Sequence, residues 1–97
     1  MKPSEAIKGK ESQVILTVEK YGYCNPRIFG SVASGTGKEG SDLDVLVTRT
    51  KQSGSMLSLV HLELELSELL GVHVDVKTEK MIPEHSRMEI VEGSLSL

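Results

Sequence analysis

Two valine-rich runs on either side of a leucine-rich run limit the folds that this chain can adopt. The run SDLDVLV predicts a strand at about 42 to 48, and the run VHVDV predicts a strand at about 72 to 76. Leucines recur at helical spacing between them, which favours a helix over 56 to 70 that ends at Gly71. Because a strand, helix, strand connection is nearly always a parallel crossover, the two strands are expected to run parallel in one sheet.

The remaining segments predict one further strand and three further helices. A first helix is expected over about 4 to 21, and a proline then leads into a strand at about 27 to 29. That strand is expected to pair antiparallel with the strand at 42 to 48. Short helices are expected to open at 31 to 34 and at 83 to 91. The fold class that follows is α/β in the α+β sense, a small mixed β-sheet backed by helices.

Two aspartates lie on one face of the predicted strand at 42 to 48. Asp42 and Asp44 alternate with apolar residues, so both carboxylates point to the same side. The alternating residues Leu43, Val45 and Val47 then face the core. Mg²⁺ prefers oxygen ligands, commonly one or two carboxylates together with substrate phosphates and waters. The pair therefore predicts a magnesium site.

A third carboxylate is expected to join this pair. In VHVDV the valines occupy one face, which leaves Asp75 on the side where Asp42 and Asp44 lie if the strands share a sheet. The alternative is an edge-strand aspartate exposed to solvent. His73 shares the face of Asp75, where it either orients the site or is simply packed or solvated. Three carboxylates suit phosphoryl-type transfer, in which two metal ions about 3.5 to 4 Å apart clamp the attacking and leaving oxygens.

A glycine-rich connection supplies candidate nucleotide-binding residues. Gly30 allows the backbone to approach a phosphate closely, and Ser31 adds a hydroxyl. If Ser31 to Ser34 form the first turn of a helix, their free N–H groups point at the same place. Lys38 either reaches a phosphate or is a solvated loop lysine. Residues 35 to 40 match G-x-G-x-x-G, but a strand follows them, whereas the dinucleotide motif needs a strand before it and a helix opening within it.

Together these residues resemble the motif of a known family. The order along the chain is Gly-Ser, ten residues, Asp-x-Asp and then a carboxylate on a later strand. This order resembles the motif of the minimal nucleotidyltransferases of the DNA polymerase β superfamily, most closely that of the small antitoxins paired with HEPN-domain toxins. The resemblance covers nearly the whole chain and implies a polymerase β-like nucleotidyltransferase fold. It implies that Asp42 and Asp44 hold the metal ions and that Asp75 completes the metal site near the attacking hydroxyl. Many relatives read Gly-Ser-x-Ala-Arg-Gly, whereas Ser34 stands here in place of the arginine.

The resemblance also implies an activity and a partner. It implies a Mg²⁺-dependent nucleotidyltransferase, with two magnesium ions and ATP as substrate, that places AMP on a tyrosine hydroxyl of a HEPN toxin and inactivates it. So small a domain has no spare segment for an acceptor pocket, which also favours an acceptor on a partner. Two alternatives stay open: an antitoxin that acts by binding alone, and a transferase for a small molecule such as an aminoglycoside, with another subunit completing the pocket.

Composition bounds the remaining possibilities. The 97 residues are expected to form one domain, 1–97, with a formal net charge of −3 and no basic run interleaved with aromatics, so free nucleic acid is not an expected partner. No segment has the length and apolarity of a membrane span or a signal peptide, which favours a cytoplasmic protein. The single Cys24 agrees with a reducing compartment. Residues 93 to 97 are expected to dock on a partner or to fray, and the chain is compatible with a homodimer or a hetero-oligomer.

Overall fold

The computed structural model describes residues 6–29 and 42–97. These residues form a four-stranded sheet with the strand order β3-β2-β1-β4. The strands are β1 (Tyr23–Phe29), β2 (Leu43–Arg49), β3 (Val74–Thr78) and β4 (Leu95–Ser96). Strand β1 pairs antiparallel with β2 and with β4, whereas β2 pairs parallel with β3. The predicted mixed sheet and both predicted strand pairings are confirmed.

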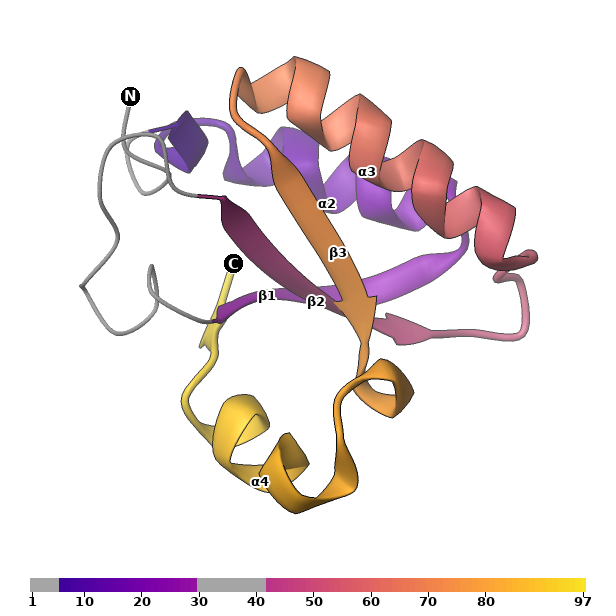
Figure 1. The fold of residues 1–97 in the computed structure, drawn as a ribbon. Helices are drawn as coiled ribbons and strands as arrows, with labels where there is room; N and C mark the ends of the chain where they lie inside the picture. The colour runs from indigo at the N-terminus through magenta and orange to yellow at the C-terminus, as the bar shows by residue number, and fades with distance from the viewer. Residues whose placement is uncertain (1–5, 30–41) are drawn as a thin grey trace.

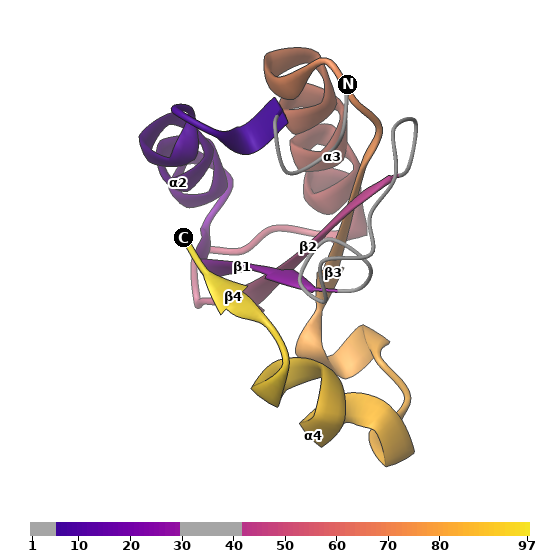
Figure 2. The same ribbon diagram turned by 90° about the vertical axis from the view of Figure 1, so that its left-hand side faces the viewer.

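Helices lie on both sides of the sheet. The helices α2 (Glu11–Lys20) and α3 (Met56–Leu70) cover one face, and α4 (Glu84–Glu92) lies on the other side (Figure 1 and Figure 2). A 3₁₀ turn, η1 (Glu79–Met81), joins β3 to α4. This layering is the α+β architecture that the sequence predicts. Within the described ranges, no helix combines the length and apolarity that crossing a membrane requires.

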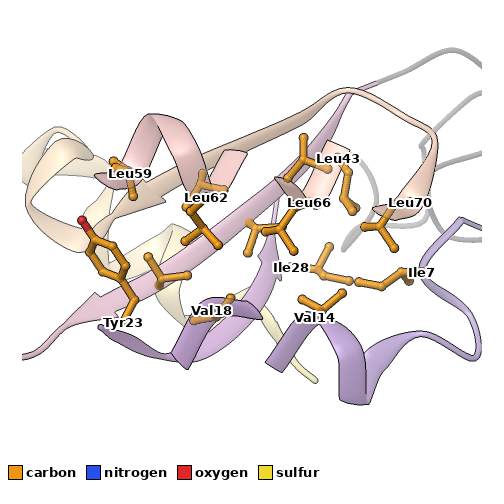
Figure 3. Packing of buried hydrophobic residues seen from close by; sticks show 14 of the residues in the cluster. Ile7, Val14, Val18, Tyr23, Ile28, Leu43, Leu59, Leu62, Leu66 and Leu70 are labelled. Atoms are coloured by element: carbon orange, nitrogen blue, oxygen red, sulfur yellow. The ribbon is translucent and has the colours of Figure 1, made fainter. Parts of the chain in front are cut away.

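The main core lies between the sheet and the layer formed by α2 and α3 (Figure 3). Leu43, Val45 and Val47 are fully buried in it, as their alternation along the strand predicts. The two helices pack against them through residues at helical spacing. The buried residues of the helices are Val14, Val18, Leu59, Leu62, Leu66 and Leu70.

A smaller apolar cluster covers part of the opposite face. Phe29 and Leu46 of the sheet pack there with Ile82, and α4 lies against them. Asp44 precedes Leu46 by two residues on β2 and therefore shares this face. The face thus changes from apolar at Leu46 to acidic at Asp44, toward the beginning of the strand.

Helix α3 has the bounds that the sequence predicts, 56 to 70. Ser55 caps its N-terminus, because the Ser55 hydroxyl accepts the Leu57 N–H at 3.3 Å. Gly71 ends the helix in the left-handed conformation, at a φ of +72°, and its N–H donates to the Ser67 carbonyl at 2.9 Å. A capping residue and a helix stop therefore enclose a run of strong helix formers, which overrides the strand-like alternation within it.

The first predicted helix is interrupted. Residues 6–7 are helical, but Gly9 takes a φ of +81° and α2 begins only at Glu11. A glycine in the left-handed region commonly ends a helix, and this is the physical reason for the break. The prediction of one continuous helix over 4 to 21 is therefore wrong.

Two strands differ from their predicted bounds. Strand β1 begins at Tyr23, before the predicted start at residue 27. Pro26 lies inside β1, where the register with β2 is irregular and Asn25 has a φ of +52°. Such irregularities are where a strand tolerates proline. Strand β3 is displaced toward the C-terminus relative to the predicted 72 to 76.

The C-terminal residues join the sheet. Leu95 and Ser96 form β4 and pair with Ile28 and Arg27 of β1. The Leu97 N–H also donates to a β1 carbonyl, at 3.3 Å. Of the two alternatives expected for residues 93 to 97, fraying is therefore wrong, because β1 offers an open edge that local sequence does not reveal. The short helix predicted at 31 to 34 lies outside the described residues.

Candidate active site

The parallel pairing of β2 and β3 places two predicted site carboxylates side by side. Asp44 and Asp75 are Cα partners in this register, and each is the second residue of its strand. Partnered residues on neighbouring strands project to the same face, so both side chains lie on the face opposite the main core. Asp42 comes just before β2 and is exposed. The three aspartates therefore lie together where the two parallel strands begin.

The carboxylate of Asp44 lies in an unfavourable electrostatic setting. Its burial raises the pKa of Asp44 above the usual value, and the charges of Asp75 and, more weakly, Asp42 raise this pKa further. Lys77 and His73 oppose the rise. An excess of negative charge around a half-buried carboxylate favours a cation beside it.

A lysine and a histidine contact the other two aspartates. The Lys77 ammonium lies 3.5 Å from Asp75 Oδ2, and His73 Nδ1 lies 3.3 Å from Asp42 Oδ1. All four side chains are at least one-third exposed, so each pair contributes little to stability. His73 is thus both solvated and beside the site. Lys77 belongs to no motif in the sequence, although its spacing from Asp75 in a strand places both on one face.

The donor set of this cluster fits Mg²⁺. Asp42, Asp44 and Asp75 offer carboxylate oxygens, which Mg²⁺ prefers, and a bound cation relieves their mutual repulsion. Within residues 6–29 and 42–97, no three Asp, Glu, His or Cys side chains are already grouped as ligands of one ion. Coordination by all three aspartates therefore requires the side chains to rearrange, including the contacts with Lys77 and His73.

The candidate nucleotide-binding residues belong to the segment between β1 and β2. Phe29, the last residue of β1, is the Cα partner of Asp44, so β1 ends directly beside the carboxylates. The chain continues from this point into the predicted phosphate-binding turn. The residues predicted there lie outside the described residues: Gly30, Ser31, Ser34 and Lys38.

A fourth acidic side chain, Glu63 of α3, approaches β3 near the same site. Its Oε2 accepts the Val76 N–H at 3.0 Å. Burial raises the pKa of Glu63, the hydrogen bond from Val76 lowers it, and the charge of Asp75 raises it. Glu63 is therefore partly buried against β3 and is not a fully solvated glutamate. No local pattern separates it from Glu65, because contact with β3 depends on the tertiary fold.

Replacing Asp44 with asparagine is expected to raise the stability of the protein near neutral pH and to leave it unchanged in acid. The pKa of Asp44 is raised above its ordinary value of 3.8, so the folded protein binds this proton more tightly than the unfolded chain. The contribution of Asp44 to stability is therefore most favourable at low pH and declines as the pH rises through the folded-state pKa.

Urea unfolding of both proteins at about pH 7 and about pH 3 measures this difference. We expect Asp44→Asn to be the more stable protein at the higher pH only. Asp42→Asn is the matched control, because the Asp42 side chain is 61% exposed and its neutralisation should change stability little. A stability gain of equal size at both pH values would contradict the explanation from charge.

Known proteins of similar sequence include nucleotidyltransferases. Residues 26–96 match a family model described as a nucleotidyltransferase domain. A relative from Methanocaldococcus jannaschii, provisionally named protein adenylyltransferase MJ0435, is 43% identical over 76 residues, which cover 78% of this chain and 77% of the relative. Protein adenylyltransferase MntA from Thermococcus cleftensis is 40% identical over 58 residues. That match covers 60% of this chain and 58% of MntA, which is less than two thirds of its length.

Solved structures share the fold. One, provisionally described as a minimal nucleotidyltransferase, has a TM-score of 0.84 and 32% identity, covering 97% of this chain and 95% of that chain. Another is a crystal structure of a toxin-antitoxin with AMP-PNP, which has a TM-score of 0.74 and 19% identity. The match covers 89% of this chain and 70% of that chain, and it concerns the fold alone.

Proposed function

This chain belongs to the nucleotidyltransferase family, and we propose that it uses Mg²⁺ to transfer AMP from ATP to a hydroxyl of a partner protein. The observation that carries the proposal is the pairing of Asp44 with Asp75 across β2 and β3, with Asp42 beside them. Relatives named protein adenylyltransferases support the choice of AMP and of a protein acceptor.

In this proposal Asp42, Asp44 and Asp75 hold two Mg²⁺ ions. The ions would neutralise the triphosphate and stabilise the attacking and leaving oxygens. The acceptor hydroxyl gives up its proton to solvent, and its oxygen forms a bond to the α-phosphorus. The bond between the α-phosphorus and the oxygen of the leaving pyrophosphate breaks in the same step. Asp75 belongs to β3, an edge strand of the sheet, so an acceptor reaches it without crossing the other strands. Binding of the triphosphate by Gly30 and Ser31 stays a prediction from the sequence.

The proposed partner is a HEPN toxin, with a tyrosine hydroxyl as the acceptor and inactivation of the toxin as the outcome. The motif resemblance supports this choice, as does a structural neighbour that is a toxin-antitoxin crystallised with AMP-PNP. Two surface depressions among the described residues, with volumes of about 690 and 310 Å³, have none of the three aspartates in their lining. The Asp42 and Asp75 side chains are 61% and 35% exposed, which suits an acceptor that a partner supplies.

The transfer can be followed directly with labelled nucleotide. Incubating the protein with a HEPN toxin, Mg²⁺ and ATP labelled at the α-phosphate is expected to label the toxin. Chelating the metal should abolish the labelling, because the triphosphate and the three carboxylates repel one another without it. ATP labelled at the γ-phosphate is the matched control, since that label leaves with pyrophosphate. A toxin whose intact mass does not increase by one AMP would refute the proposal.

A further inference from the structure

Strand β3 is one of the two edge strands of the sheet, and side chains of α3 accept its outward N–H groups on both sides of Asp75. The Val74 N–H donates to Ser67 Oγ at 3.0 Å, and the Val76 N–H donates to Glu63 Oε2 at 3.0 Å. An outermost strand ordinarily leaves such groups to solvent. Asp75 therefore lies between two residues whose backbone N–H groups donate hydrogen bonds to side chains of α3.

We propose that Glu63 and Ser67 are positioning residues for Asp75, which they hold beside Asp44 by fixing the backbone of β3 on either side of it. The inference rests on the proposed function, because it assigns to these two residues a role in building the metal site. Neither side chain needs to touch the substrate or the metal. Their effect passes through the strand that carries the third carboxylate.

The geometry of helix and strand explains why this residue pair suits the task. Residues four apart on a helix lie on one side, separated by about 6 Å along the axis, so Glu63 and Ser67 face the same way. Residues two apart on a strand are separated by about 6.6 Å, so the outward amides at 74 and 76 have nearly the same spacing. The distance between Glu63 and Ser67 along α3 thus matches the distance between the outward N–H groups of Val74 and Val76 along β3.

The Ser67 hydroxyl is itself held in place. It donates to the Glu63 carbonyl at 2.8 Å while it accepts from Val74. The Ser67 carbonyl accepts the N–H of Gly71, the residue that ends α3. The last turn of the helix and the beginning of β3 are therefore joined through one residue, which limits how far the strand can move relative to the helix.

A carboxylate at position 63 is not required for the hydrogen bond to Val76. A glutamine side chain has an oxygen that accepts an N–H in the same way. The charge of Glu63 lies near that of Asp75, and the two repel each other. Glu63→Gln therefore removes the charge and keeps the hydrogen bond, whereas Glu63→Ala removes both.

The test compares Ser67→Ala, Glu63→Ala and Glu63→Gln in the full chain by two measurements. Hydrogen exchange of the Val74 and Val76 amides reports whether the strand is held. Titration with Mn²⁺ in the presence of a non-hydrolysable ATP analogue, followed by electron paramagnetic resonance, reports whether the metal site forms. Glu68→Ala is the control, because Glu68 is an exposed glutamate of the same helix.

We expect each alanine variant to accelerate exchange at its own amide and to weaken Mn²⁺ binding by about tenfold, the scale of one lost hydrogen bond to a strong acceptor. Glu63→Gln and the control should bind Mn²⁺ as the unaltered protein does. Normal Mn²⁺ binding in both alanine variants, or weak binding in Glu63→Gln, would overturn the positioning role alone. If the unaltered protein binds no Mn²⁺ with the nucleotide, the proposed function fails, and this role fails with it.

Discussion

Asp44→Asn is expected to lower the rate of AMP transfer by about a thousandfold without disturbing the fold. Asparagine keeps the shape of the side chain but removes one of the charges proposed to hold the metal ions. A loss of about 4 kcal/mol of transition-state stabilisation corresponds to a factor of about a thousand. The fold should persist, because burial and the charge of Asp75 both disfavour a charged Asp44. Removing the Asp44 charge therefore relieves its repulsion with Asp75. Initial rates of toxin labelling measure the effect.

Glu19→Gln is the matched control, since it removes one negative charge from an exposed position on α2. It should transfer AMP at the rate of the unaltered protein. The same Asp44 variant also separates the catalytic proposal from an antitoxin that acts by contact alone. Cells that carry the toxin should not be rescued by Asp44→Asn if transfer is the neutralising step. Full rescue by this variant would instead favour neutralisation by binding.

Gly22→Ala is expected to destabilise the protein by about 3 kcal/mol and to lower its Tm by roughly 15 °C. Gly22 has a φ of +84°, a conformation that disfavours any side chain. A Cβ at this position would also collide with the backbone carbonyl of Gln52. The neighbouring chain is not free to move away, because the Gly22 carbonyl accepts hydrogen bonds from the hydroxyls of Thr50 and Ser53. Thermal unfolding followed by circular dichroism measures the loss.

Gly71→Ala separates the stability loss caused by the collision from the loss caused by the backbone conformation. Gly71 has a similar φ of +72°, but a Cβ there would meet no atom within 4 Å. We expect this variant to lose only about 1 kcal/mol, the cost of the left-handed conformation alone. Equal losses in the two variants would show that the contact with Gln52 does not matter.

Local sequence patterns predict those helices and strands in which the buried residues recur at a single helical or strand spacing. The alternation around Asp44 correctly predicts the buried face of β2, because a strand between two covered faces has little freedom in register. The leucines at helical spacing and the stop at Gly71 correctly bound α3. The parallel arrangement of β2 and β3 then follows from the order of the elements.

Features that depend on contacts between distant segments are not predictable in this way. The pairing of β4 with β1 joins the C-terminal residues to a strand that is distant in the sequence, and neither segment alone carries a signal for it. The contact of Glu63 with Val76 likewise appears only once α3 and β3 are placed. The sequence nevertheless places Asp75 in a strand, and the parallel register then sets it opposite Asp44.

Occupation of the outer amides of β3 also restricts how other chains can approach this protein. Besides Val74 and Val76, the Thr78 N–H has a partner within the chain, the sulfur of Met81 at 3.5 Å. A foreign strand that tried to extend the sheet there would find no open ladder of donors, and such ladders drive both strand addition and edge-to-edge aggregation. A toxin approaching Asp75 from this side would therefore have to be recognised through side chains rather than through shared backbone pairing.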